Sequence, residues 1–146
     1  MEERSAGAVV FSGKGGRRYL VLLNKERWDF PKGNMEKGEG ELDTVRREVR
    51  EETGLRSLQI LKGFRRVIEY FYRRDGKNVH KKVFYYLART DDDRVTISDE
   101  HQDFVWLGYA ECLAKLSYGN SKATLREAEK FLGAREDLET DERVLL

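Results

Sequence analysis

Three glutamates spaced within five positions are the residues of this sequence best suited to chemistry. Glu48, Glu51 and Glu52 lie in a stretch whose apolar residues recur at helical spacing and form the expected buried stripe, Leu42, Val45 and Val49. At about 100° per residue the three carboxylates fall within an arc of roughly 100°, beside the apolar stripe. Carboxylates this close repel each other, and a hard divalent cation relieves the repulsion. An all-oxygen set of this kind predicts a Mg²⁺ site.

The alternative is an acidic helix face exposed to water and balanced by the basic residues Arg46, Arg47 and Arg50. Helices rich in glutamate and arginine are common on protein surfaces and need no function. A longer pattern around the glutamates favours the metal site over this alternative.

That pattern runs Gly33, five residues, Glu39, seven residues, Arg47-Glu48-Val49, one residue, Glu51-Glu52, one residue, Gly54-Leu55. It resembles the Nudix box at every defined position, and the resemblance covers about residues 5–132. The resemblance implies the Nudix fold, which is an α/β/α sandwich with a mixed β-sheet and a loop-helix-loop catalytic motif. It also implies a hydrolase that cuts a phosphoanhydride bond in a nucleoside-linked polyphosphate.

The resemblance implies roles for individual residues of the box. Glu48, Glu51 and Glu52 are the expected metal ligands, and the Gly33 carbonyl is an additional one. The ion is expected to be Mg²⁺ or Mn²⁺, with more than one ion when substrate is bound. Arg47 is expected to orient the glutamates by charge-assisted hydrogen bonds, and Glu39 and Gly54 to brace the loop and cap the helix. The general base stays open between Glu48, Glu52 and the more distant Glu100.

The flanking residues resemble one branch of the family, the hydrolases that cut diadenosine tetraphosphate asymmetrically into ATP and AMP. The matching segments are Trp28-Asp29-Phe30-Pro31-Lys32-Gly33, Gly63-Phe64-Arg65-Arg66, Ser98-Asp99-Glu100-His101-Gln102 and Trp106-Leu107-Gly108. Two features depart from that branch. Asn34 stands where its members often have histidine, and a longer hairpin leaves Lys81 and Lys82 as competing matches for one phosphate-binding lysine.

The same resemblance implies the substrate contacts. Lys32 and Lys81 are expected on the phosphate chain, Tyr70 and Tyr118 on the two faces of an adenine, and Trp28 at the mouth of the site. Glu100 is expected to face the metal as a further ligand or as the base. Each residue also has an ordinary structural interpretation, as a half-buried strand tyrosine, a surface lysine or a loop acid.

A cluster of basic residues spans one expected hairpin, and its members are Lys62, Arg65, Arg66, Arg73, Arg74, Lys77, His80, Lys81 and Lys82. The cluster is either an electrostatic funnel for an anionic substrate or an edge strand protected by charge. A funnel would also suit an RNA 5′ end, a diphosphoinositol polyphosphate or a nucleoside triphosphate. A non-catalytic nucleotide-sensing module is the distant alternative, because such a module is expected to have lost box glutamates.

The expected elements place the box between two sheet segments. Strands are expected at residues 6–11, 19–23, 58–72, 83–88 and 104–107, a loop at 28–40, and helices at 41–53, 109–116 and 122–132. The first two strands are expected to form a hairpin, and Asp75-Gly76 is a strong signal for another. Gly54 is expected to end the box helix in the left-handed conformation.

Bulk properties agree with a small intracellular enzyme. The 146 residues predict a single domain, with a core of about residues 5–133 and a charged C-terminal tail. The formal net charge of +1 indicates no particular partner, and no apolar run is long enough for a membrane span. Polar first residues predict no signal peptide, and the lone Cys112 fits the cytoplasm. The protein is expected to be a monomer or weak dimer.

Overall fold

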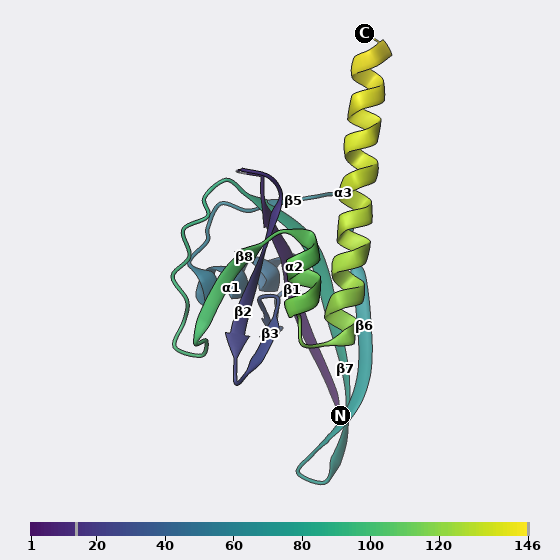
Figure 1. Ribbon diagram of the computed structural model, residues 1–146. Coiled ribbons are helices and arrows are strands. Elements are labelled where there is room, and N and C mark those ends of the chain that lie inside the picture. Colours follow the sequence, from purple (N-terminus) through teal and green to yellow (C-terminus); the bar gives the residue numbers. More distant parts are fainter. Residues whose placement is uncertain (14, 146) are drawn as a thin grey trace.

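A computed structural model describes residues 1–13 and 15–145, with side chains through residue 136. Within these residues the chain forms eight strands and three helices (Figure 1). The strands are β1 (Glu2–Ser12), β2 (Arg18–Asn24), β3 (Arg27–Asp29), β4 (Lys32–Asn34), β5 (Gln59–Ile60), β6 (Arg66–Arg74), β7 (Lys77–Thr90) and β8 (Asp103–Leu107). The helices are α1 (Glu41–Thr53), α2 (Tyr109–Lys115) and α3 (Gly119–Leu145).

The strands form one mixed sheet, as expected. Its main path is β3-β2-β1-β7-β5, and β8 pairs with β2, β4 with β1 and β6 with β7. The long central strands β1 and β7 run parallel, with Ser5 opposite Val83, while the other pairs are antiparallel. The expected hairpin of the first two strands is confirmed, although Lys14 in its turn lies outside the described residues.

The sheet separates two cores, because successive strand residues point to opposite faces. On one face the buried β1 residues Ala8 and Val10 belong to the same apolar cluster as Val45 and Val49 of α1. On the other face Val9 lies in a cluster with residues of α2 and α3. Helices therefore cover both faces of the sheet, which confirms the α/β/α sandwich (Figure 1).

Helix α1 has the bounds that the sequence predicts. It ends at Gly54, which adopts φ 76° and donates its N–H to the Arg50 carbonyl at 2.8 Å. One detail of the prediction is wrong: Leu42, expected on the buried stripe, is 42% exposed. Its angular position suits the stripe, but it lies in the first turn, where its side chain reaches solvent. Buried Glu52 and Thr53 continue the stripe at the other end of the helix.

The expected loop at residues 28–40 instead contains the short strands β3 and β4. Strand β4 pairs with β1 through Gly7, which lies opposite Lys32. A Cβ atom at Gly7 would overlap the Pro31 carbonyl oxygen and the Lys32 side chain, so only glycine permits this approach. Gly7, which allows β4 to pair with β1, thus lies far from β4 in the sequence. Turn signals within residues 28–40 therefore could not predict this pairing.

The last helix is longer than expected. Helix α3 starts at Gly119 and continues through Leu145 instead of ending at Leu132. The added segment contains neither glycine nor proline after Gly133, so nothing in it breaks the helix. The turn at Asp75-Gly76 is confirmed, with both residues at positive φ. Within the described residues, no helix combines the length and apolar character needed to cross a membrane.

Candidate active site

The three box glutamates occupy different depths on α1. Glu52 is 7% exposed, the Glu48 side chain is 13% exposed and the Glu51 side chain is 55% exposed. Burial of Glu52 follows from its place on the sheet-facing stripe, where its Oε2 accepts a hydrogen bond from the Lys32 backbone N–H at 3.1 Å. The expectation that the carboxylates lie at the edge of the buried face therefore holds for Glu52 and Glu48.

These glutamates line a polar cavity of about 860 Å³, the carboxylate cavity. It is lined by Ser5, Asn24, Lys32, Gly33, Asn34, Glu36, Arg47, Glu48, Glu51, Glu52, Lys81, Ser98, Asp99 and Glu100. The cavity therefore gathers all of the candidate metal ligands, including Glu100 from the loop before β8. It also brings two of the candidate phosphate contacts, Lys32 and Lys81, to the same place.

The cavity holds its carboxylates in an environment that disfavours their charge. Burial raises the pKa of Glu52 to about 8, with the negative charges of Glu48 and Glu100 adding to the effect. Burial likewise raises the pKa of Glu48, against the opposing influence of Arg47. An additional cation in this cavity would remove the conflict, because it would favour the ionised form of both groups.

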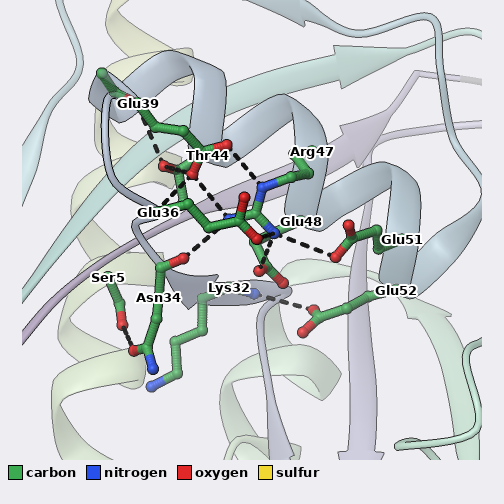
Figure 2. A network of polar contacts seen from close by, with 11 residues as sticks. Ser5, Lys32, Asn34, Glu36, Glu39, Thr44, Arg47, Glu48, Glu51 and Glu52 are labelled. Carbon is green, nitrogen blue, oxygen red and sulfur yellow. Dashed lines mark hydrogen bonds and ion pairs between the residues drawn. The ribbon is translucent and has the colours of Figure 1, made fainter.

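Arg47 joins the helix to the loop before it (Figure 2). Its guanidinium donates two hydrogen bonds to Glu39, at 2.7 and 2.9 Å, and one to the carbonyl of Asn34 at 2.9 Å. It also donates to Glu48 at 2.7 Å and to Glu51 at 3.2 Å. One planar side chain thus fixes the loop and two of the acids, which is the geometry expected of an orienting arginine.

Glu39 is the loop acid that Arg47 holds. Its carboxylate also accepts hydrogen bonds from the Glu36 backbone N–H and the Thr44 hydroxyl, both at 2.8 Å. The Arg47 hydrogen bond, supported by the Glu36 N–H, lowers the pKa of Glu39 to about 2. Glu39 therefore stays ionised at any ordinary pH and braces the loop, as the sequence led us to expect.

The residues able to hold a metal are Glu48, Glu51, Glu52, Glu100 and the Gly33 carbonyl. Among the described side chains no three acidic, histidine or cysteine groups converge on a single point. Figure 2 shows why for Glu48 and Glu51, whose carboxylates are turned toward Arg47. A Cβ atom at Gly33 would overlap the Glu48 carboxylate, so glycine is needed for the acid to lie against the loop. Arg47 bonds one oxygen of each carboxylate, Glu48 Oε1 and Glu51 Oε2.

A second cavity, of about 430 Å³, lies beside the first and is named the two-tyrosine cavity after Tyr70 and Tyr118 in its lining. Its lining is Asp29, Lys32, Ile68, Tyr70, Val83, Tyr85, Tyr118, Asn120 and Ser121. Tyr70 and Tyr118 are 36% and 43% exposed and come from β6 and from the link between α2 and α3. The cavity therefore brings together two accessible aromatic rings that lie 48 positions apart in the sequence. A third cavity, of about 470 Å³, shares Lys32 and Tyr118 with the second cavity and Lys32, Glu52 and Glu100 with the first.

The structure distinguishes the two candidate lysines of β7. Lys81 lines the carboxylate cavity, and its ammonium donates to the Asn34 side-chain oxygen at 3.3 Å. Burial, followed by the nearby charge of Lys32, lowers the pKa of Lys81. Lys82 points to the other face and pairs with Glu69 at 3.6 Å. Asn34, which replaces the frequent histidine, also accepts a hydrogen bond from Ser5 at 2.8 Å.

Trp28 packs against the apolar core next to the site. Its ring packs against the apolar cluster beneath α2 and α3, and the Lys115 ammonium lies 4.6 Å from the ring centre. Its backbone N–H donates to the Ser117 hydroxyl at 2.8 Å, next to the tyrosine of the second cavity. A direct contact between Trp28 and substrate stays a prediction, and the observed contacts assign the ring to packing.

Five members of the basic cluster lie within ion-pair distance of acids, and one of these, His80, carries a charge only when protonated. Arg65 pairs with Glu41 at 2.9 Å, and Lys82 pairs with Glu69. Arg74, His80 and Lys81 also face acidic partners, among them Glu3. This pairing favours the edge-strand interpretation over the electrostatic funnel, because charges already matched by acids attract an anion less.

Sequence reasoning missed two residues of this region. Asp29 lines the second and third cavities and binds both Ser121 and Lys32. Gly7 seats β4, as described above. Neither had a local signal, because Ser121, which donates to Asp29, and residues 31–32, which approach Gly7, lie far from them in the sequence.

Comparison with known proteins identifies the family. The model of the NUDIX domain matches residues 1–127, so the chain belongs to the NUDIX family, whose hydrolases are metal-dependent. The asymmetrical bis(5′-nucleosyl)-tetraphosphatase of Mus musculus is 42% identical over 151 aligned residues, covering 90% of this chain and 97% of the mouse protein.

Two further comparisons add structural and functional context. A Caenorhabditis elegans Ap4A hydrolase in a binary complex superposes with a TM-score of 0.80 at 29% identity, over 90% of this chain and 98% of that one. An RNA pyrophosphohydrolase of Bartonella henselae is 40% identical, but over only 40% of this chain and 39% of its own length.

Proposed function

We propose that this NUDIX hydrolase is an asymmetrical bis(5′-nucleosyl)-tetraphosphatase, which hydrolyses diadenosine tetraphosphate to ATP and AMP. The observation that carries the proposal is that Lys32 lines both the carboxylate cavity and the two-tyrosine cavity. A single ligand with an aromatic base and a phosphate chain can therefore occupy both. The similarity to the mouse tetraphosphatase along nearly its whole length supports the same substrate.

In this proposal the chain supplies binding, orientation and a base. Tyr70 and Tyr118 hold one adenine, and Lys32 and Lys81 contact the phosphate chain. Glu48, Glu51, Glu52, Glu100 and the Gly33 carbonyl would hold Mg²⁺ or Mn²⁺, with more than one ion in the substrate complex. The ions would neutralise phosphate oxygens and make water a better nucleophile. The proton of the attacking water goes to Glu48, Glu52 or Glu100, all of which line one cavity.

Product analysis in ¹⁸O-labelled water tests the proposal. Diadenosine tetraphosphate with Mg²⁺ is expected to give ATP and AMP, with the label in AMP, because water attacks the phosphorus next to the leaving ATP. Two molecules of ADP would contradict the asymmetrical cut. No turnover of the dinucleotide, together with turnover of a triphosphorylated RNA 5′ end, would reassign the enzyme to RNA. The short match to the Bartonella henselae protein and the paired basic cluster support that alternative less well.

Tyr70→Ala is expected to raise KM for diadenosine tetraphosphate by about 5- to 100-fold, because stacking contributes about 1–3 kcal/mol per base. The inhibition constant of inorganic tetraphosphate, which has no base, is expected to stay within about twofold. Phe71→Ala is the matched control, since Phe71 is the next residue of β6, points to the opposite face and is 74% exposed. Equal effects of Tyr70→Ala on both ligands would remove the stacking role.

Metal binding is expected to release protons at neutral pH. With a pKa of about 8, Glu52 is largely protonated at pH 7 in the metal-free protein, and a metal ligand must be ionised. The affinity for Mg²⁺ should therefore rise with pH through 7 and level off above about 8. Calorimetry in buffers of different ionisation enthalpy measures the protons released. A Mg²⁺ affinity that is flat between pH 6 and 9, with no proton release, would contradict ligation by Glu52.

The proposal extends to organisation and location. One NUDIX domain acting in the cytoplasm as a monomer or weak dimer is consistent with the single buried cysteine, Cys112.

A further inference from the structure

Strand β3 is fastened to the link between α2 and α3, the segment that carries Tyr118. The Ser117 backbone N–H donates to the Trp28 carbonyl at 3.1 Å, and the Trp28 N–H donates back to the Ser117 hydroxyl at 2.8 Å. One residue further along β3, the Ser121 hydroxyl donates to Asp29 Oδ1 at 2.6 Å. The fastening therefore holds both ends of the segment from Ser117 to Ser121.

Asp29 is the charged member of this fastening. Its side chain is 15% exposed, and Oδ1 also accepts the Phe30 backbone N–H at 2.8 Å. Its other oxygen, Oδ2, lies 3.4 Å from the Lys32 ammonium. The Nudix box begins at Gly33, so Asp29 lies outside it. Asp29 thus contacts Ser121, which lines the two-tyrosine cavity, and Lys32, which is expected to bind the phosphate chain.

The Ser121 contact governs Tyr118 through the first turn of α3. Ser121 is 3% exposed, so its hydroxyl exchanges little with water and is held by its protein partners, the Asp29 carboxylate and the Tyr85 hydroxyl. The Tyr118 carbonyl accepts the Lys122 backbone N–H at 3.0 Å, which makes Tyr118 part of the same turn. A shift of Ser121 would therefore shift the exposed ring of Tyr118 relative to Tyr70.

We propose that Asp29 is a positioning residue for nucleobase recognition, which holds the first turn of α3, and with it Tyr118, opposite Tyr70. The inference rests on the proposed function for the identity of the ligand in that cavity. It predicts that the Asp29–Ser121 hydrogen bond affects ligands that carry a base and leaves ligands made only of phosphate unaffected.

Ser121→Ala removes the hydrogen bond to Asp29 and the contact with Tyr85, and it leaves Asp29 and its contact with Lys32 in place. KM for diadenosine tetraphosphate is expected to rise about three- to tenfold, because only part of the free energy of a hydrogen bond to a charged group is transmitted to the position of Tyr118. The value of kcat and the inhibition constant of inorganic tetraphosphate are expected to stay within about twofold. An unchanged KM, or equal increases for both ligands, would overturn the proposal.

Variants of Asp29 identify the interaction. Asp29→Ala is expected to raise KM for the dinucleotide at least as much as Ser121→Ala, because it also removes the contacts of Asp29 with Lys32 and Phe30. The double variant is expected to raise KM no further than Asp29→Ala, since both substitutions remove the same Asp29–Ser121 hydrogen bond. Asp29→Asn keeps an oxygen that accepts from Ser121 and is expected to restore KM to within about threefold of the wild type. Full additivity in the double variant, or a KM for Asp29→Asn as high as that for Asp29→Ala, would contradict the positioning role.

A control and a turnover-free measurement separate this inference from the proposed function. Asp93→Asn removes a half-exposed ion pair to Arg18, outside the cavities, and is expected to leave all of these constants unchanged. Binding of ATP and of inorganic triphosphate, measured by calorimetry, requires no tetraphosphate hydrolysis. If the wild type does not cleave diadenosine tetraphosphate, the proposed function fails. A selective loss of ATP binding in Ser121→Ala would still support the role of Asp29, and equal binding by variant and wild type would refute it.

Discussion

Replacing Glu52 with glutamine is expected to lower kcat on diadenosine tetraphosphate by more than about a hundredfold. Loss of a residue that only hydrogen-bonds to a metal ligand costs about 10- to 100-fold, and loss of a ligand itself should cost more. Glutamine has the same shape and can still accept the hydrogen bond from the Lys32 N–H, so the fold should persist. It cannot supply a negative charge to a metal or accept a proton as a base. Steady-state kinetics under saturating Mg²⁺ measures the effect.

Stability gives this variant a second signature. The pKa of Glu52 rises from 4.5 to about 8 on folding, so its contribution to stability falls as the pH rises between these values, and the full cost of ionising the buried group is present above about 8. Metal-free Glu52→Gln should therefore have a Tm at pH 9 equal to or above that of the wild type. Glu111→Gln, on the remote helix α2, is the matched control and should change neither quantity. A wild-type kcat in Glu52→Gln would exclude its place in the chemistry.

Arg47→Lys is the second substitution with a large expected effect. Lysine keeps the positive charge but cannot reproduce five hydrogen bonds from one planar group to Glu39, Asn34, Glu48 and Glu51. The expected result is a loss of about 10- to 100-fold in kcat/KM. The Mg²⁺ concentration for half-maximal activity should also rise, because two candidate ligands lose their orientation.

The neighbouring arginine provides a control for Arg47. Arg46 lies one position earlier on α1 and donates to the Leu58 carbonyl at 3.2 Å, so it contacts none of the acids of the cavity. Arg46→Lys should retain kcat/KM within about threefold of the wild type, as expected for a surface substitution. If both variants lost activity equally, the effect would come from the helix as a whole and not from the Arg47 contacts.

Sequence reasoning succeeded where the signal is local. The bounds of α1, the left-handed Gly54 and the Asp75-Gly76 turn follow from short-range rules of periodicity and backbone freedom. The placement of Glu48 and Glu52 at one cavity also followed from helical spacing, since residues three and four apart share a face, while their role as metal ligands stays a prediction. These features need no knowledge of where the rest of the chain lies.

The remaining features depend on contacts between distant segments. Asp29 and Ser121 are 92 positions apart, and only the folded sheet brings them together. Two of the acids that pair with the basic hairpin likewise come from other elements: Glu41 of α1 pairs with Arg65, and Glu3 of β1 pairs with Arg74. The choice of Lys81 over Lys82 depended on the register of β6 and β7, where a shift of one residue exchanges the faces.

The length of α3 has a practical consequence for experiments on this enzyme. The helix has 27 residues, about 40 Å at 1.5 Å per residue, and extends beyond the sheet in Figure 1. Tyr118 lies just before its first turn, so the cavity that Tyr118 and Tyr70 line is near one end of this helix and Leu145 is at the other. An immobilisation tag or fluorescent label attached at the C-terminus would therefore leave the route of the substrate clear. Surface-tethered and single-molecule measurements of binding can use that attachment point.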